Sequence, residues 1–406
     1  MDFFEALLLH TIIKRLRYGA LYEKYFVLVV QYMVNKQTID GVGKRGKGYM
    51  INNLYIENFR GLQNLKIEDM KRMTLISGKN NIGKSTVLEA LFLLMDHSSS
   101  DSLTRQNVFR GSTSVGNVSL WEPLFFNMNP DNTIVIKAME HDVEYVLSYK
   151  KDSNYLPVKA NGVSENLLAQ FRTATQNSYS LFLEFNKNMN QRTEYHEEGH
   201  FLLNGVTILQ QITTNMPGNE IQTMRPTQYV NASIVRMSNL ILDSIGRLEL
   251  QDKKSVIVKV LQELDPDITD ILTLSIEGMT QLYLRVKGQL IPLQFAGDGV
   301  AKLLNICLAI MEKKNGLVLI DELETGFHFS MYSKIWKMID RLSKESNCQV
   351  IATTHSYELI AAVRDNLNNK PDFTYFRMGK NKSGIKAYQY SYEMLGKALD
   401  SEMEVR

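Results

Sequence analysis

The chain has 406 residues, and its composition, 44% hydrophobic and 22% charged, is ordinary for a soluble globular protein with room for two or three compact units. Its formal net charge of +2 excludes binding to nucleic acid through the overall charge, so any such contact must come from a local patch. The apolar runs near the N-terminus are shorter than the ~20 residues of a transmembrane helix, and we expect no membrane partner.

The chain contains two cysteines, Cys307 and Cys348. They lack the spacing of a metal site, and each lies in or beside an apolar segment. We therefore predict two buried, reduced thiols, which fit a reducing cytoplasm.

Residues 1–49 differ from the rest of the chain. Apolar residues from Phe3 to Leu16 could form an amphipathic helix, but acidic residues precede them and basic residues follow, which is the reverse of a signal peptide. Two interpretations stay open: a translated leader upstream of a natural start at Met50, or a helix that binds a partner or a membrane surface. We favour the leader, because a predicted strand begins at Ile51, directly after that methionine.

A glycine-containing loop, GKNNIGKST, matches the phosphate-binding pattern G-x-x-x-x-G-K-[ST]. Gly78 and Gly83 allow a tight turn whose backbone N–H groups surround phosphates. Lys84 would place its ammonium on the β and γ phosphates, and the Ser85 hydroxyl would supply one oxygen to Mg²⁺. The predicted nucleotide-binding residues of this loop are Gly78, Lys79, Asn80, Asn81, Ile82, Gly83, Lys84, Ser85 and Thr86.

The segments around this loop support the prediction. A strand-like run, Met73 to Ile76, precedes it, and an apolar stripe from Val87 to Met95 predicts a helix after it. The positive end of that helix would point at the phosphates. A chance match in an ordinary turn is the alternative, and the strand and helix on either side argue against it.

Two acidic residues follow an apolar strand at 317–320. Asp321 would reach Mg²⁺, directly or through water, so the predicted metal ligands are Ser85 and Asp321. Glu322 is the predicted general base for the attacking water. The plain alternative for such a pair is a helix N-cap, which the phosphate loop in the same chain makes the weaker interpretation.

A second apolar strand, Val350 to Ala352, ends in small polar residues and His355. His355 could donate a hydrogen bond to the γ-phosphate or position the water, although a lone histidine is usually structural. The predicted catalytic residues are Glu322, His355 and Lys84.

The region between the phosphate loop and residue 290 contains both β and α patterns. Strands are predicted at 133–138, 143–149 and 181–185, and helices at 234–245 and 256–264. The absence of sustained heptads argues against a long coiled coil.

In their order along the chain, these motifs resemble those of the ABC-type ATPases, and in particular the group of chromosome-maintenance, RecF-like and overcoming-lysogenisation-defect (OLD) ATPases. Ile51 to Leu62 looks like the first strand and NFRGL turn of that group, and Asn80-Asn81 is similar to the OLD form of the phosphate loop. Phe295 to Gly299 occupies the place of the ABC signature, although it reads A-G-D-G. Glu324 to His328 resembles the D-loop, and Thr353 to Ser356 resembles the H-loop.

The resemblance implies an α/β fold, a P-loop NTPase of the ABC-ATPase head type with a mixed sheet, an antiparallel β subdomain and an inserted helical arm. It implies ATP and Mg²⁺ as cofactors. It also implies a homodimer, or a higher oligomer, in which Gly297, Asp298 and Gly299 of one chain contact the ATP of the other. The glutamine of the usual Q-loop is not assigned, although Gln106 and Trp121 lie in the expected region.

On this basis four regions are expected. Residues 1–49 are an extension, 50–150 form ATPase lobe I with the phosphate loop, 151–290 form an inserted helical and β arm region, and 291–406 form lobe II with the remaining motifs.

The leading hypothesis is an ATPase whose ATP-dependent dimerisation acts as a switch in a nucleic-acid-related or anti-phage task. The residues after His355 are too few for the Toprim nuclease of longer OLD proteins, so we expect a separate effector such as a nuclease. Nucleic acid stays open as a partner. The alternatives are an ABC transporter subunit, disfavoured by the missing L-S-G-G-Q, and a slow ATP-gated scaffold.

Overall fold

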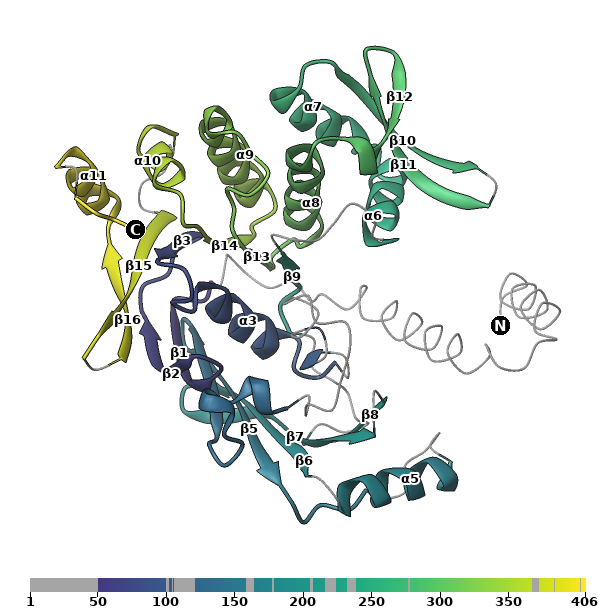
Figure 1. Cartoon of the computed structure of the whole chain (residues 1–406), viewed down its shortest axis with the longest axis vertical. Helices are drawn as coiled ribbons and strands as arrows, with labels where there is room; N and C mark the ends of the chain where they lie inside the picture. The colour runs from purple at the N-terminus through teal and green to yellow at the C-terminus, as the bar shows by residue number, and fades with distance from the viewer. Residues whose placement is uncertain are drawn as a thin grey trace. The chain divides into compact units, whose positions relative to one another are not determined.

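Two β-sheets lie on opposite sides of one helix, α3 (Lys84–Met95), in the computed structural model of this chain (Figure 1). The structure describes residues 50–99, 102–103, 105, 121–157, 164–176, 179–204, 207–215, 224–231, 239–276, 278–366, 372–382, 384–401 and 403–406, all within one unit, Gly48–Arg406. The predicted extension, 1–49, and Gln106 lie outside the described residues.

The central sheet has six strands, of which five are parallel and the edge strand β16 is antiparallel. Strands β3, β13 and β14 are buried along their whole length, which explains their largely apolar sequences. In spatial order the strands are β16 (Gly384–Tyr390), β15 (Phe373–Asn381), β3 (Met73–Gly78), β14 (Gln349–Thr353), β13 (Leu317–Ile320) and β9 (Thr227–Val230).

The second sheet has seven strands, each antiparallel to its neighbours. Buried and partly exposed residues alternate along β4 and much of β5, because one face of the sheet covers α3. In spatial order the strands are β2 (Leu62–Ile67), β1 (Asn53–Phe59), β4 (Ile134–Glu140), β5 (Val143–Asp152), β6 (Ser180–Met189), β7 (Arg192–Asn204) and β8 (Thr207–Thr214).

Helix α3 is buried around nearly its whole circumference because a sheet covers each side. The strand and helix predicted around the phosphate loop are confirmed as β3 and α3. The predicted arm region supplies three strands of the seven-stranded sheet, β6 to β8, and the edge strand β9 of the central sheet. A short helix, α5 (Glu165–Gln176), lies between β5 and β6, and two single-turn helices, η1 (Glu122–Leu124) and η2 (Phe126–Met128), precede β4.

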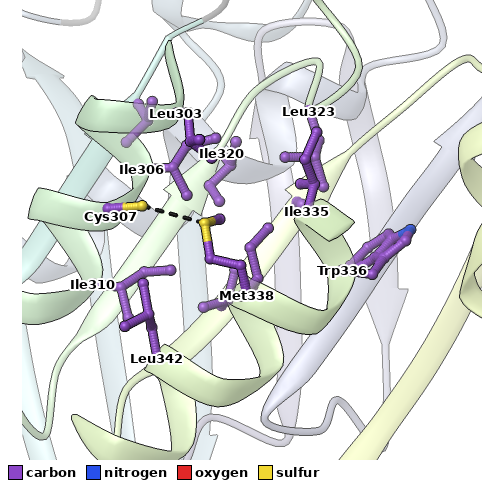
Figure 2. Close-up of a cluster of buried hydrophobic side chains, with 14 of the residues drawn as sticks. Leu303, Ile306, Cys307, Ile310, Ile320, Leu323, Ile335, Trp336, Met338 and Leu342 are labelled. Carbon is purple, nitrogen blue, oxygen red and sulfur yellow. Dashed lines mark hydrogen bonds between the residues drawn. The ribbon is translucent and has the colours of Figure 1, made fainter. Parts of the chain in front are cut away.

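Helices α8 (Asp298–Glu312), α9 (Tyr332–Glu345), α10 (Tyr357–Asn366) and α11 (Tyr392–Asp400) cover the other face of the central sheet (Figure 1). Figure 2 shows side chains of α8 and α9 packed together, with the Cys307 thiol 3.3 Å from Met338 Sδ. Both cysteines are free and buried, as predicted, and burial raises the pKa of both thiols, that of Cys348 to about 12. They are therefore inert parts of the core.

The predicted helices of the arm appear as α6 (Asn239–Leu250) and α7 (Lys254–Leu264), and residues 232–238 lie outside the described part. A three-stranded antiparallel sheet follows, with β10 (Ile268–Ile276), β11 (Met279–Val286) and β12 (Gln289–Pro292). It leads through η4 (Leu293–Phe295) into α8, and η5 (Phe329–Met331) leads into α9. Across the described ranges, no helix is both long and apolar enough to cross a membrane.

Candidate functional site

The predicted site residues come from the carboxyl ends of adjacent parallel strands. Thr353 on β14 pairs with Ile76 on β3, and Ile320 on β13 pairs with Ala352 on β14 and Val230 on β9. The residues that follow these strands therefore meet at one edge of the sheet, where open α/β sheets hold their ligands.

The phosphate loop leaves β3 at Gly78 and enters α3 at Gly83. Both glycines have positive φ, 143° and 97°, and Asn81 between them has φ 62°. A Cβ at Gly78 would lie 2.7 Å from the Met378 carbonyl oxygen, and one at Gly83 would lie 2.9 Å from Leu62 Cδ2. Backbone conformation and space therefore both require glycine at these two positions.

The ammonium of Lys84 folds back over this loop. Its Nζ donates to the carbonyl oxygens of Gly78 at 2.8 Å and Lys79 at 3.1 Å. Burial lowers the pKa of Lys84, and the charges of Glu324, Asp321 and Glu322 partly oppose this effect. The cation is thus held at the loop with acidic residues nearby.

Ser85 and Asp321, which are 236 residues apart in sequence, lie in direct contact: Ser85 Oγ donates to Asp321 Oδ1 at 2.9 Å. Thr353 Oγ1 donates to the same oxygen at 2.6 Å, and the Tyr229 hydroxyl donates to Oδ2 at 3.3 Å. The carboxylate of Asp321 thus accepts three hydrogen bonds while buried, which fixes its position. The sequence did not single out Thr353 or Tyr229 for this role.

Glu322 has φ 45°, a left-handed conformation that costs a residue with a side chain about 1–3 kcal/mol. Its N–H donates to Thr353 Oγ1 at 2.9 Å, and its Oε2 accepts from Thr325 Oγ1 at 3.2 Å. These bonds hold a turn that would otherwise relax, and they keep the Glu322 carboxylate close to its own loop.

Lys302, on α8, is a further buried cation that the sequence analysis missed. Its Nζ donates to the carbonyl oxygen of Asp321 at 3.3 Å and to that of Glu322. Burial lowers the pKa of Lys302 to about 8, against the opposing charges of nearby carboxylates, Glu324 first. Lys302 therefore ties α8 to the backbone of the two predicted acids.

His355 contacts a carboxylate that was not among the predicted site residues. Its backbone N–H donates to Glu324 Oε1 at 2.8 Å, and its Nδ1 lies 2.6 Å from the same oxygen. Glu324 is buried, whereas half of the His355 side chain, 49%, is exposed. The resemblance placed Glu324 in the D-loop segment, which was the signal for its role.

The turn at the start of α8, Gly297 to Gly299, contacts the D-loop segment of the same chain. A Cβ at Gly299 would lie 2.6 Å from the Gly326 carbonyl oxygen, and one at Gly326 would lie 3.3 Å from Cβ of Asp298. Gly297 is the N-cap of α8. The turn is therefore placed by close backbone packing against the segment that follows the two acids.

Asn231 directly follows β9 and comes level with Asp321 at the sheet edge, because Ile320 pairs with Val230. It is buried, with 7% of its surface exposed. The Q-loop glutamine is not assigned from the sequence, and Trp121, from the expected region, is buried in the core between α3 and the seven-stranded sheet.

Among the described residues, no group of three or more His, Cys, Asp or Glu side chains is arranged to hold a metal ion. Mg²⁺ commonly takes only one or two protein ligands and completes its shell with phosphate and water. The Ser85 hydroxyl and the Asp321 carboxylate, 2.9 Å apart, are hard oxygen donors that fit this pattern.

Comparison with known proteins finds a matching family model and several similar proteins. A family model described as AAA domain, putative AbiEii toxin, Type IV TA system matches residues 73–361. A Helicobacter pylori protein named ATP/GTP phosphatase is 25% identical over 354 residues, which cover 80% of this chain and 90% of that protein. The DNA replication and repair protein RecF of Thermoanaerobacter sp. is 31% identical over 112 residues, 28% of this chain and 27% of RecF.

Among solved structures, the SmcHead bound to the C-winged helix domain of ScpA is similar. That match covers 84% of this chain and 98% of the SmcHead chain, at 14% identity and a TM-score of 0.46.

Proposed function

The chain belongs to the AAA-domain family described as putative AbiEii toxin of a type IV TA system, and from this membership we propose that it binds and hydrolyses ATP. The single observation that carries the proposal is the hydrogen bond of 2.9 Å between Ser85 Oγ and Asp321 Oδ1. It joins the phosphate loop to the acid at the end of β13, as a nucleotide-hydrolysing site requires. The name of the Helicobacter pylori relative supports the same activity.

In the proposed site the loop N–H groups and Lys84 bind the phosphates. The Lys84 ammonium now bonds to loop carbonyls, and phosphate oxygens would take over these hydrogen bonds. Ser85 and Asp321 would hold Mg²⁺, which when bound neutralises charge on the phosphates.

Glu322 is the proposed general base and His355 the proposed donor to the γ-phosphate. The turn that carries Glu322 is fixed by Thr353 and Lys302, so the carboxylate needs little reorganisation to meet a water molecule. His355 lies at the neighbouring strand end with half of its side chain exposed, which leaves room for a phosphate oxygen.

The turn Gly297–Asp298–Gly299 is proposed to bind the ATP of a second copy, which makes the active form a homodimer. Glycine N–H groups at the start of α8 suit an anion. Two exposed aromatic residues lie near these packed segments in sequence: Phe295, two residues before the turn, with 74% of its surface exposed, and Phe329, three residues after Gly326, with 64%. Exposed aromatic side chains of this kind are enriched at protein interfaces.

We further propose that ATP-dependent dimerisation is a switch in nucleic-acid-related or anti-phage defence, with a separate effector and a cytoplasmic location. The toxin–antitoxin description of the family supports a defence role, and the short match to RecF supports a link to nucleic acid.

Phosphate release from ATP by the purified full chain tests the activity. Lys84→Ala should reduce ATP affinity and turnover by at least about tenfold, because the phosphates lose a charge-assisted hydrogen bond. Lys66→Ala is the matched control. Lys66 lies on β2, is exposed, and pairs with Glu68, the first residue after that strand. Equal turnover in wild type and Lys84→Ala would refute the proposed site.

A further inference from the structure

We propose that Glu324 is a positioning residue: it fixes the ring of His355 so that Nδ1 is held by the protein and Nε2 faces the open side of the site. The inference rests on the proposed function, because the orientation of His355 matters only if the ring meets the γ-phosphate.

One carboxylate oxygen holds both the backbone and the ring of His355. Glu324 Oε1 accepts from the His355 N–H at 2.8 Å and lies 2.6 Å from Nδ1. A carboxylate accepts hydrogen bonds, so we infer that Nδ1 carries the hydrogen in this short contact. In the neutral ring Nε2 is then the atom without a proton, and the two contacts together restrict rotation of the ring.

The burial of the pair is strongly asymmetric. The Glu324 side chain is 7% exposed and that of His355 is 49% exposed. Because Nδ1 contacts the buried partner, we infer that the exposed part of the ring includes Nε2. A ring anchored from inside can present Nε2 to a ligand without the entropic cost of ordering it on binding.

The second oxygen, Glu324 Oε2, is buried and has no hydrogen-bond partner among the described residues. Leaving a buried acceptor unsatisfied destabilises the fold, and more so when the group is charged. Selection for stability alone would favour an apolar side chain here, so the contact with His355 explains the carboxylate better than packing does.

Two buried lysines lie within electrostatic range of this buried acid. Glu324 is the strongest of the three carboxylates that oppose the effect of burial on the pKa of Lys84 and of Lys302. It is therefore near enough to both the phosphate loop and α8 to act electrostatically on their two lysines. The two lysines partly offset the charge of the Glu324 carboxylate, and its Oε1 contacts His355.

The test combines a spectroscopic and a kinetic measurement on the full chain. Nitrogen-15 NMR of histidine-labelled protein at alkaline pH reports which ring nitrogen carries the proton, and the His355 signal is assigned by its loss in His355→Gln. We expect a proton on Nδ1 in the wild type and a shift toward the Nε2-protonated form in Glu324→Ala. Glu324→Met keeps the length of the side chain and removes both acceptor oxygens, and it replaces the alanine variant if that variant does not fold.

The kinetic expectation is a fall in kcat of at least about tenfold in Glu324→Ala, comparable to the loss of a carboxylate behind a functional histidine. KM for ATP should change by less than about twofold, since Glu324 is not proposed to touch ATP. The matched control is Glu198→Gln, which breaks an exposed pair of Glu198 Oε1 and His196 Nε2, 3.0 Å apart on β7. It should alter the His196 signal only.

A wild-type His355 ring protonated on Nε2, or unchanged His355 signals in both Glu324 variants, would overturn the inference. The NMR result does not depend on turnover, so it decides the role of Glu324 even if the protein proves not to hydrolyse ATP. If the wild type carries the proton on Nδ1 but does not hydrolyse ATP, the result counts against the proposed function and not against the role of Glu324.

Discussion

The burial of Lys302, which donates to the backbone of Asp321 and Glu322, predicts how the unfolding free energy changes with pH. Its side chain is 8% exposed, and its ammonium bonds to the carbonyl oxygens of Asp321 and Glu322. Burial lowers its pKa from the ordinary value of 10.5 to about 8. Replacing it by methionine keeps the length of the side chain and removes the titrating group.

The direction of the effect follows from proton linkage. Below pH 8 the lysine is protonated in both the folded and the unfolded chain, and the cost of its burial is fully present. Between pH 8 and 10.5 the unfolded chain binds about one more proton than the folded one, so this group makes stability rise with pH, at about 1.4 kcal/mol per pH unit. Over the whole window the gain is about 3 kcal/mol.

Urea unfolding of wild type and Lys302→Met at several pH values from 7 to about 10.5 measures this gain. Between pH 8 and 10.5 we expect the unfolding free energy of the wild type to rise by about 3 kcal/mol relative to that of Lys302→Met. Lys334→Met is the control, because Lys334 is exposed and also donates to a backbone carbonyl, that of Glu263. Parallel pH profiles for wild type and Lys302→Met would refute the reasoning.

Two further substitutions test the site. Thr353→Val should lower the unfolding free energy by about 3 kcal/mol in urea, because the buried Asp321 carboxylate loses a hydrogen bond and the partly buried Glu322 N–H loses its acceptor; an unchanged midpoint would contradict this. Gly299→Ala should weaken ATP-dependent dimerisation in light scattering while leaving ATP binding intact, since its Cβ would meet the Gly326 oxygen at 2.6 Å. In Gly396→Ala, the control, the Cβ meets no atom within 4 Å, and equal dimerisation of both variants would argue against the proposed interface.

The elements that the sequence predicts well are those buried on all sides. Strands β3, β13 and β14 are largely apolar because helices or sheets cover both of their faces, and α3 is largely apolar around its circumference for the same reason. The strand and helix predictions around the site therefore succeed because these elements are the most buried part of the fold.

The small sheet β10–β12 was missed because its strands are only partly buried. The predicted boundary between lobe I and the arm at residue 150 falls inside β5, and β5 pairs with β6 across the intervening α5. Such pairing depends on tertiary contacts that a local pattern does not contain.

The missed site residues fall into two kinds. Lys302 is the only charged residue among the apolar ones from Val300 to Met311, and this was a readable signal of a buried functional cation. Tyr229 left no such signal, because it reaches Asp321 only through the parallel pairing of β9 with β13.

The most direct test of the central claim is a single-turnover measurement with radiolabelled ATP in wild type and Glu322→Gln, with protein in excess over ATP. The amide cannot accept a proton from water, so the wild type should convert bound ATP to ADP while Glu322→Gln retains ATP and accumulates as an ATP-bound dimer. Equal rates of ATP cleavage in the two proteins, or a Glu322→Gln chain that stays monomeric with ATP bound, would contradict the account.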